Sequence, residues 1–172
     1  MVELEDIIIR PILSHEHAML KHLAYSYARK TGIPTTDVVK EQNYLVGLIG
    51  SYVVCVNHFG TPQIFNIARS MGYMEKADFP GMNLDVKSSR LNPSKPILEH
   101  SLVVREKDFD MENVYYLVLV DLSIEGLPQA HIVGWQNGNK FPIVVEGDGP
   151  FKGAYKIKAR ELLPIPKITW YR

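Results

Sequence analysis

The feature that most constrains this chain is the alternation of polar and apolar side chains through residues 83–90, Asn-Leu-Asp-Val-Lys-Ser-Ser-Arg. Successive side chains of a β-strand point to opposite faces of the sheet. Asp85 and Lys87 therefore share one face, and Leu84 and Val86 share the other. The pattern predicts a strand that packs its apolar face against a core and carries a carboxylate beside an ammonium group on its polar face.

A second acid precedes this strand at a spacing that suggests a hairpin. Asp78 lies seven residues before Asp85 and is followed by Phe79-Pro80-Gly81-Met82. If Gly81 and Met82 form a two-residue hairpin loop, Phe79 pairs with Leu84 and Asp78 pairs with Asp85. Directly opposed residues have β-carbons roughly 4.5–5.5 Å apart. Two carboxylates at that distance repel each other unless they share a proton or a cation.

A hard divalent cation is the usual partner of such a pair of acids. Mg²⁺ takes oxygen ligands and keeps several of its waters. Lys87, on the same face of the strand, is then placed to hold or activate the water that attacks a phosphate. These residues indicate metal-assisted hydrolysis of a phosphodiester. The alternative is an ordinary solvated strand face, on which an acid and a lysine two residues apart are common.

The length, composition and charge of the chain limit the classes of protein to which it can belong. A chain of 172 residues fits one domain with a substantial core, and 46% hydrophobic with 22% charged residues is ordinary for a globular protein. No apolar run is long enough to span a bilayer, and the N-terminus does not resemble a signal peptide. The single cysteine, Cys55, excludes an internal disulfide, so we expect a cytoplasmic protein. Nineteen basic and nineteen acidic residues argue against a protein that coats nucleic acid through overall charge.

The order of the expected elements indicates the fold class. Helices are expected over residues 14–29, 37–58 and 61–71, and strands over 73–79, 83–90, 97–105, 114–122, 130–135 and 155–158. Helices followed by strands indicate an α/β domain with a mixed or antiparallel sheet. We expect one domain over residues 1–172, comprising an N-terminal helical extension (1–35), a core (36–136) and an irregular C-terminal segment (137–172).

The segment Leu84-Asp85-Val86-Lys87-Ser88-Ser89, with Asp78 before it, resembles the motif of the PD-(D/E)xK nuclease superfamily, which includes restriction enzymes and Holliday-junction resolvases. The resemblance covers roughly residues 41–135. It implies a restriction-endonuclease-like core, which is a mixed β-sheet flanked by helices. It also implies a metal-dependent endonuclease that hydrolyses DNA, of a kind carried by phages or mobile elements. In this superfamily Asp78 and Asp85 would ligate Mg²⁺ or Mn²⁺, and Lys87 would orient or deprotonate the attacking water.

The chain departs from the superfamily pattern on the helix before the motif. Members often carry a further metal-site glutamate in a Gly-x-x-Gly-Glu setting, whereas here Ser51 follows Gly47-Leu48-Ile49-Gly50. Three interpretations follow: the site works with two acids, Glu41 substitutes from elsewhere on the helix, or activity is impaired. Glu41 lies ten residues earlier, about 15 Å along a helix axis. A second departure is the helical pattern at 61–71, where the sheet would be expected to begin.

Other polar residues are candidates for nucleic-acid contacts or for structural roles. Ser89, Arg90, Lys95 and Gln136 are the side chains expected to contact DNA. His100 and His131 fall in strand-like segments and are expected to be hydrogen-bonded structural residues. An enzyme of this size that cuts both strands would need two copies related by a twofold axis, so a homodimer is expected.

Two other functions stay open at this point. One is a catalytically silent protein of the same fold that binds nucleic acid or a protein partner, which the serine at position 51 and the neutral charge favour. The other is an unrelated small α/β protein, for instance a phage structural or assembly protein, in which Asp78 and Asp85 are surface residues.

Overall fold

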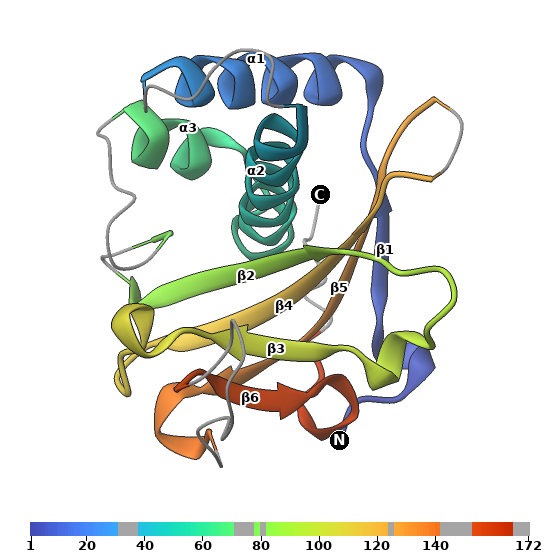
Figure 1. Cartoon of the computed structure of the whole chain (residues 1–172), viewed down its shortest axis with the longest axis vertical. Coiled ribbons are helices and arrows are strands. Elements are labelled where there is room, and N and C mark those ends of the chain that lie inside the picture. The colour runs from blue at the N-terminus through green and yellow to red at the C-terminus, as the bar shows by residue number, and fades with distance from the viewer. Residues whose placement is uncertain (31–37, 71–77, 80–81, 124–125, 142–152, 167–172) are drawn as a thin grey trace.

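A four-stranded mixed sheet forms the centre of the molecule (Figure 1). The computed structural model describes residues 1–30, 38–70, 78–79, 82–123, 126–141 and 153–166. The strand order is β1-β5-β4-β2, with β2 parallel to β4 and the other neighbours antiparallel. The strands are β1 (Ile8–Pro11), β2 (Leu84–Arg90), β4 (Val114–Asp121) and β5 (Gln129–Asn137). The predicted α/β class with a mixed sheet is confirmed.

Helices cover one face of this sheet, and a second, two-stranded sheet lies on the other (Figure 1). The helices are α1 (Ser14–Lys30), α2 (Val38–Phe59) and α3 (Gln63–Ser70). The second sheet pairs β3 (Ser101–Val104) with β6 (Tyr155–Lys158) in antiparallel fashion. Each face of the main sheet therefore has its own apolar core, one shared with the helices and one shared with β3 and β6.

The long helix α2 contributes more residues than any other element to the core that the main sheet shares with the helices. Its residues 45–55 are buried apart from Gly47, because it lies between α1 and the main sheet. Gly50 allows the close approach of β2, since a β-carbon at this position would clash with Oγ of Ser88. Overpacking of this kind strains neighbouring side chains and backbone. The contact fixes how α2 lies over the strand that carries Asp85 and Lys87.

The buried carboxylate of Glu16 links α2 to α1 and to β1. Glu16, near the start of α1, accepts hydrogen bonds from the Tyr52 hydroxyl at 2.7 Å, from Arg10 Nη2 at 2.7 Å and from the Leu13 backbone N–H at 2.9 Å. A buried charge is tolerated only when it is paired and hydrogen-bonded in this way. The network joins β1, α1 and α2.

The expected helices and most of the expected strands are found within a few residues of their predicted bounds. The strand predicted over 97–105 is shorter, because residues Ile97–Glu99 form a 3₁₀ turn before β3. Residues 73–77 of another predicted strand lie outside the described part of the chain. The segment expected as an N-terminal extension contributes β1 to the main sheet, and the expected irregular C-terminal segment contributes β6 to the second sheet.

The two histidines predicted in strand-like segments differ: His131 lies in β5, whereas His100 directly precedes β3. His100 is hydrogen-bonded as predicted: its Nε2 accepts from the Asn92 backbone N–H at 3.3 Å, and its Nδ1 lies 3.1 Å from the Pro96 carbonyl oxygen. The same prediction is wrong for His131, because both of its ring nitrogens are buried without a hydrogen-bond partner among the described residues. Burial lowers the pKa of His131.

Candidate active site

The alternation on β2 places the candidate residues as the sequence predicts. Leu84 and Val86 belong to the core shared with the helices. Asp85 pairs with Tyr115, which belongs to the core on the opposite face. Lys87 follows on the same face as Asp85, two residues along the strand. Because β2 is an edge strand, both charged groups lie at the border of the sheet.

The turn before β2 brings Asp78 to this border. Phe79 and Leu84 form an antiparallel bridge, which is the predicted pairing, and the Met82 N–H donates to the Phe79 carbonyl oxygen at 3.0 Å. Asn83 adopts a φ of 51°, in the left-handed region that asparagine tolerates better than most residues. Pro80 and Gly81 of the expected turn lie outside the described residues.

Asp78 contacts both β2 and α2 through its carboxylate. Its Oδ2 accepts a hydrogen bond from the Val86 backbone N–H at 2.8 Å. Its Oδ1 accepts one from the Ser51 hydroxyl at 2.9 Å. Ser51 Oγ also lies 3.1 Å from the Gly47 carbonyl oxygen, so its single proton has two acceptors within reach. Ser51 thus orients the Asp78 carboxylate through its hydroxyl.

Asp85 is buried and its charge is only partly compensated. Lys87 Nζ lies 2.7 Å from Asp85 Oδ2, and Asp85 is 5% exposed. Burial raises the pKa of Asp85 to about 6, while the Lys87 charge opposes the shift. The Asp78 carboxylate contributes to the raised pKa, both through repulsion and through a hydrogen bond that favours the protonated form of Asp85. The two acids and the lysine are therefore in direct electrostatic contact.

Tyr115 lies beneath this cluster, and the sequence reasoning missed it. Lys87 Nζ lies 6.0 Å from the centroid of the Tyr115 ring. Burial raises the pKa of the Tyr115 hydroxyl, and the Asp85 charge adds to the shift. The register that pairs Asp85 with Tyr115 comes from the long-range β2–β4 ladder, for which the local sequence holds no signal.

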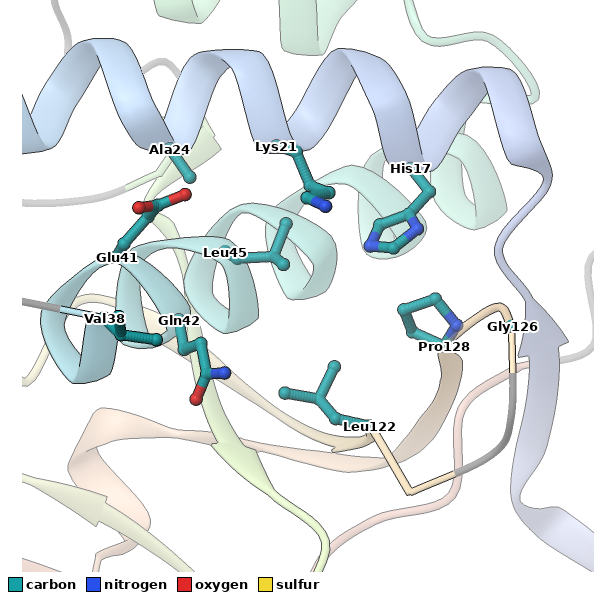
Figure 2. Close-up of a pocket in the computed structure, with 10 residues that line it drawn as sticks. All are labelled: His17, Lys21, Ala24, Val38, Glu41, Gln42, Leu45, Leu122, Gly126 and Pro128. Carbon is teal, nitrogen blue, oxygen red and sulfur yellow. The ribbon is translucent and has the colours of Figure 1, made fainter.

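The structure separates Gln136 and Glu41 from the acids. Gln136 pairs with Tyr115 on β5, so Tyr115 stands between it and Asp85. Its amide oxygen accepts from the Asn137 backbone N–H at 3.0 Å. Figure 2 shows Glu41 directed toward α1 in a separate pocket of about 320 Å³, which His17 and Lys21 also line. This placement gives no support to Glu41 as a substitute for the missing glutamate.

The remaining predicted contact residues follow Lys87 along the chain. Ser89 is exposed and lines a groove beside Lys87. Arg90 Nη2 donates to Asn43 Oδ1 of α2 at 3.3 Å. Lys95 lies in the turn after β2, where its charge acts on Glu99 and not on Asp85. Ser89 thus lies beside Lys87 in the groove, whereas Arg90 is directed to α2 and Lys95 acts on Glu99.

The donor set is suited to a cation that needs few protein ligands. No group of three or more His, Cys, Asp or Glu side chains among the described residues is arranged to hold a metal ion. Mg²⁺, however, is usually bound by one or two carboxylates, with waters and substrate phosphates as its other ligands. Asp78 and Asp85 are two adjacent carboxylates at a sheet border, so they fit this mode of binding.

Comparisons with protein-family models, with curated proteins and with solved structures find no match to this chain. None of the described helices combines the length and the apolar character that crossing a membrane requires.

Proposed function

We propose that this chain is a metal-dependent endonuclease that hydrolyses phosphodiester bonds of DNA in the manner of the PD-(D/E)xK superfamily. The observation that carries the proposal is a continuous line of contacts from α2 to β2. Ser51 donates to Asp78, Asp78 contacts Asp85, and Asp85 pairs with Lys87. Asp78, Asp85 and Lys87 occupy the motif positions of the superfamily.

Each residue has a chemical role that its contacts support. Asp78 and Asp85 would hold Mg²⁺ or Mn²⁺; such an ion stabilises negative charge on a phosphate and lowers the pKa of water. An ionised carboxylate has about four lone-pair sites, of which the Ser51 hydroxyl and the Val86 N–H each take one on Asp78. Lys87 donates up to three hydrogen bonds, of which Asp85 takes one. The others are available to a phosphate oxygen or to the attacking water.

Ser51 acts as a positioning residue under this proposal. Its hydroxyl ties the Asp78 carboxylate to α2, which is itself held against β2 at Gly50. Holding a reacting group in one orientation lowers the entropic part of an activation barrier. The site then works with two acids and needs no glutamate on the helix.

The test is cleavage of single-stranded, duplex and branched DNA with Mg²⁺, Mn²⁺ or EDTA. Asp85→Asn and Lys87→Ala are expected to lose cleavage that wild type performs only with a divalent ion. The matched controls are Glu99→Gln and Lys158→Ala, because Lys158 Nζ and Glu99 Oε2 form another acid–lysine pair, also at 2.7 Å, away from the site. Cleavage by all five proteins at the same rate would overturn the proposal.

A catalytically silent, nucleic-acid-binding protein is the second candidate. The observation that favours it is that both Asp78 oxygens and one Asp85 oxygen already have protein partners. DNA binding without cleavage under any metal condition would support this candidate against the enzyme. Cutting of both strands by the enzyme would also require a homodimer, which light scattering of the purified protein tests directly.

A further inference from the structure

A groove of about 620 Å³ opens beside Lys87, between β2 and β3. Lys87 and Ser89 line it from β2. Ser101 on β3 and Arg105, which directly follows β3, line the opposite side. The candidate lysine is therefore part of a longer channel and not an isolated surface charge.

The lining of this groove has the chemistry of a phosphate-binding surface. Lysine, arginine, serine and asparagine are the side chains that commonly contact phosphate and sugar oxygens in DNA complexes. The described lining residues include all four types, with Asn43 as the asparagine, together with the apolar Val103 and Leu117, and no carboxylate. The groove is thus complementary to an anionic chain.

Both cations of the groove keep hydrogen-bonding capacity for a ligand. Lys87 meets Asp85, and Arg105 Nε lies 2.6 Å from Asp108 Oδ2. A guanidinium has five N–H donors, so the bond through Nε leaves the terminal amino groups of Arg105 available. The Arg105 side chain is 62% exposed, so a phosphate can reach it.

We propose that this groove seats the sugar–phosphate backbone of one DNA strand, with phosphates at Lys87 and Arg105. The proposal rests on the proposed nuclease function and adds the path of the strand from the acids toward the end of β3. The lining offers cations, hydroxyls and an amide to the backbone, and phosphate contacts position a strand without reading its sequence. Binding in the groove is therefore largely independent of base sequence.

The test is the salt dependence of binding to labelled DNA, measured by fluorescence anisotropy in EDTA, where a metal-dependent enzyme cannot cut. Each neutralised phosphate contributes a slope of about −0.7 for single strands or −0.9 for duplex in a plot of log K against log salt concentration. Arg105→Ala is expected to reduce the slope by about that amount. Lys107→Ala is the matched control, because Lys107 is an exposed cation two residues away that does not line the groove. Its slope is expected to equal that of wild type.

A second variant tests the groove without changing charge. Ser101→Trp fills the channel and is expected to weaken binding at least tenfold at every salt concentration. Ser123→Trp, at an exposed serine just after β4, is the control for adding an indole. Thermal melting of each variant verifies that the protein is folded before binding is compared.

The outcomes distinguish failure of the groove proposal from failure of the proposed nuclease function. A reduced slope in Arg105→Ala with weakened binding in Ser101→Trp supports the groove, even if wild type cleaves no DNA, in which case only the catalytic proposal fails. An unchanged slope in Arg105→Ala overturns the groove, even if wild type cleaves DNA in an Asp85-dependent way. Absence of DNA binding by wild type also overturns it. Parallel measurements with single-stranded and duplex DNA show which form of DNA the groove binds.

Discussion

Replacing Asp85 by asparagine should make this protein more stable at neutral pH while removing the proposed activity. Asp85 is almost fully buried, and its pKa is raised from 3.8 to about 6, first by burial and further by Asp78. The folded state therefore holds the proton more tightly than the unfolded state does. The stabilisation that comes from this tighter binding of the Asp85 proton is full below about pH 4 and is lost as the pH rises through about 6. An asparagine side chain does not ionise, so Asp85→Asn does not lose this stabilisation as the pH rises.

The magnitude follows from the size of the pKa difference. One pKa unit corresponds to about 1.4 kcal/mol, so ionised Asp85 lowers the free energy of unfolding by up to about 3 kcal/mol above pH 6. Partial relaxation around the ionised group brings the expected gain for Asp85→Asn to about 1–3 kcal/mol. For a chain of this length, each kcal/mol shifts the melting temperature by about 2–4 °C.

The assay is urea unfolding of wild type and Asp85→Asn at several pH values between 4 and 7.5 in EDTA. The difference in stability between Asp85→Asn and wild type should be largest at pH 7.5 and should decrease toward zero as the pH falls to 4. Asp121→Asn is the control, because hydrogen bonds from Ser123 lower the pKa of Asp121 and its removal should not stabilise the protein. A variant no more stable than wild type at pH 7.5, or a gain of equal size at pH 4, would refute the reasoning.

Three further predictions concern the metal, the helix contact and the buried histidine. Mg²⁺ at millimolar concentration should raise the melting temperature of wild type but not of Asp85→Asn, because an ion that binds only the native state stabilises it; equal shifts in both proteins would remove Asp85 from the metal site. Gly50→Ala should destabilise the protein by about 1–3 kcal/mol in urea unfolding, since the added methyl group meets Ser88, and adding Ser88→Gly should restore most of the loss. Burial lowers the pKa of His131, so the unfolded state takes up its proton first and wild type should lose stability as the pH falls below about 6.5. His131→Gln should show a shallower loss over that range in melts from pH 7.5 to 5, and a parallel curve would count against the assignment.

The faces of β2 and the turn before it could be predicted because both depend on neighbours in the sequence. Period-two alternation separated Asp85 and Lys87 from Leu84 and Val86, and the structure has the same division. The Phe79–Leu84 pairing followed from the position of the glycine in the turn and is also found.

The environment of these residues could not be predicted because it depends on pairing between distant segments. Tyr115 lies under Lys87 through the parallel register of β2 and β4, and Gln136 is kept from Asp85 by the same register. The pairing of β3 with β6 joins residues more than fifty positions apart, and Arg105 and Lys87, eighteen positions apart, line the same groove. No local pattern encodes either arrangement. The role of Ser51 was equally hidden, since only the packing of α2 on β2 brings its hydroxyl to Asp78.

The hydrogen bond from the Val86 N–H to Asp78 has a consequence for how copies of this protein behave at high concentration. An exposed edge strand presents unpaired backbone groups onto which another polypeptide can add, and natural proteins block such edges with charges or bulges. Here a carboxylate occupies one of those groups, and Lys87 stands beside it on the same strand. Asp78 thus also hinders the addition of another polypeptide strand to the β2 edge. Its removal would leave the Val86 N–H open to pairing with a second copy of the chain.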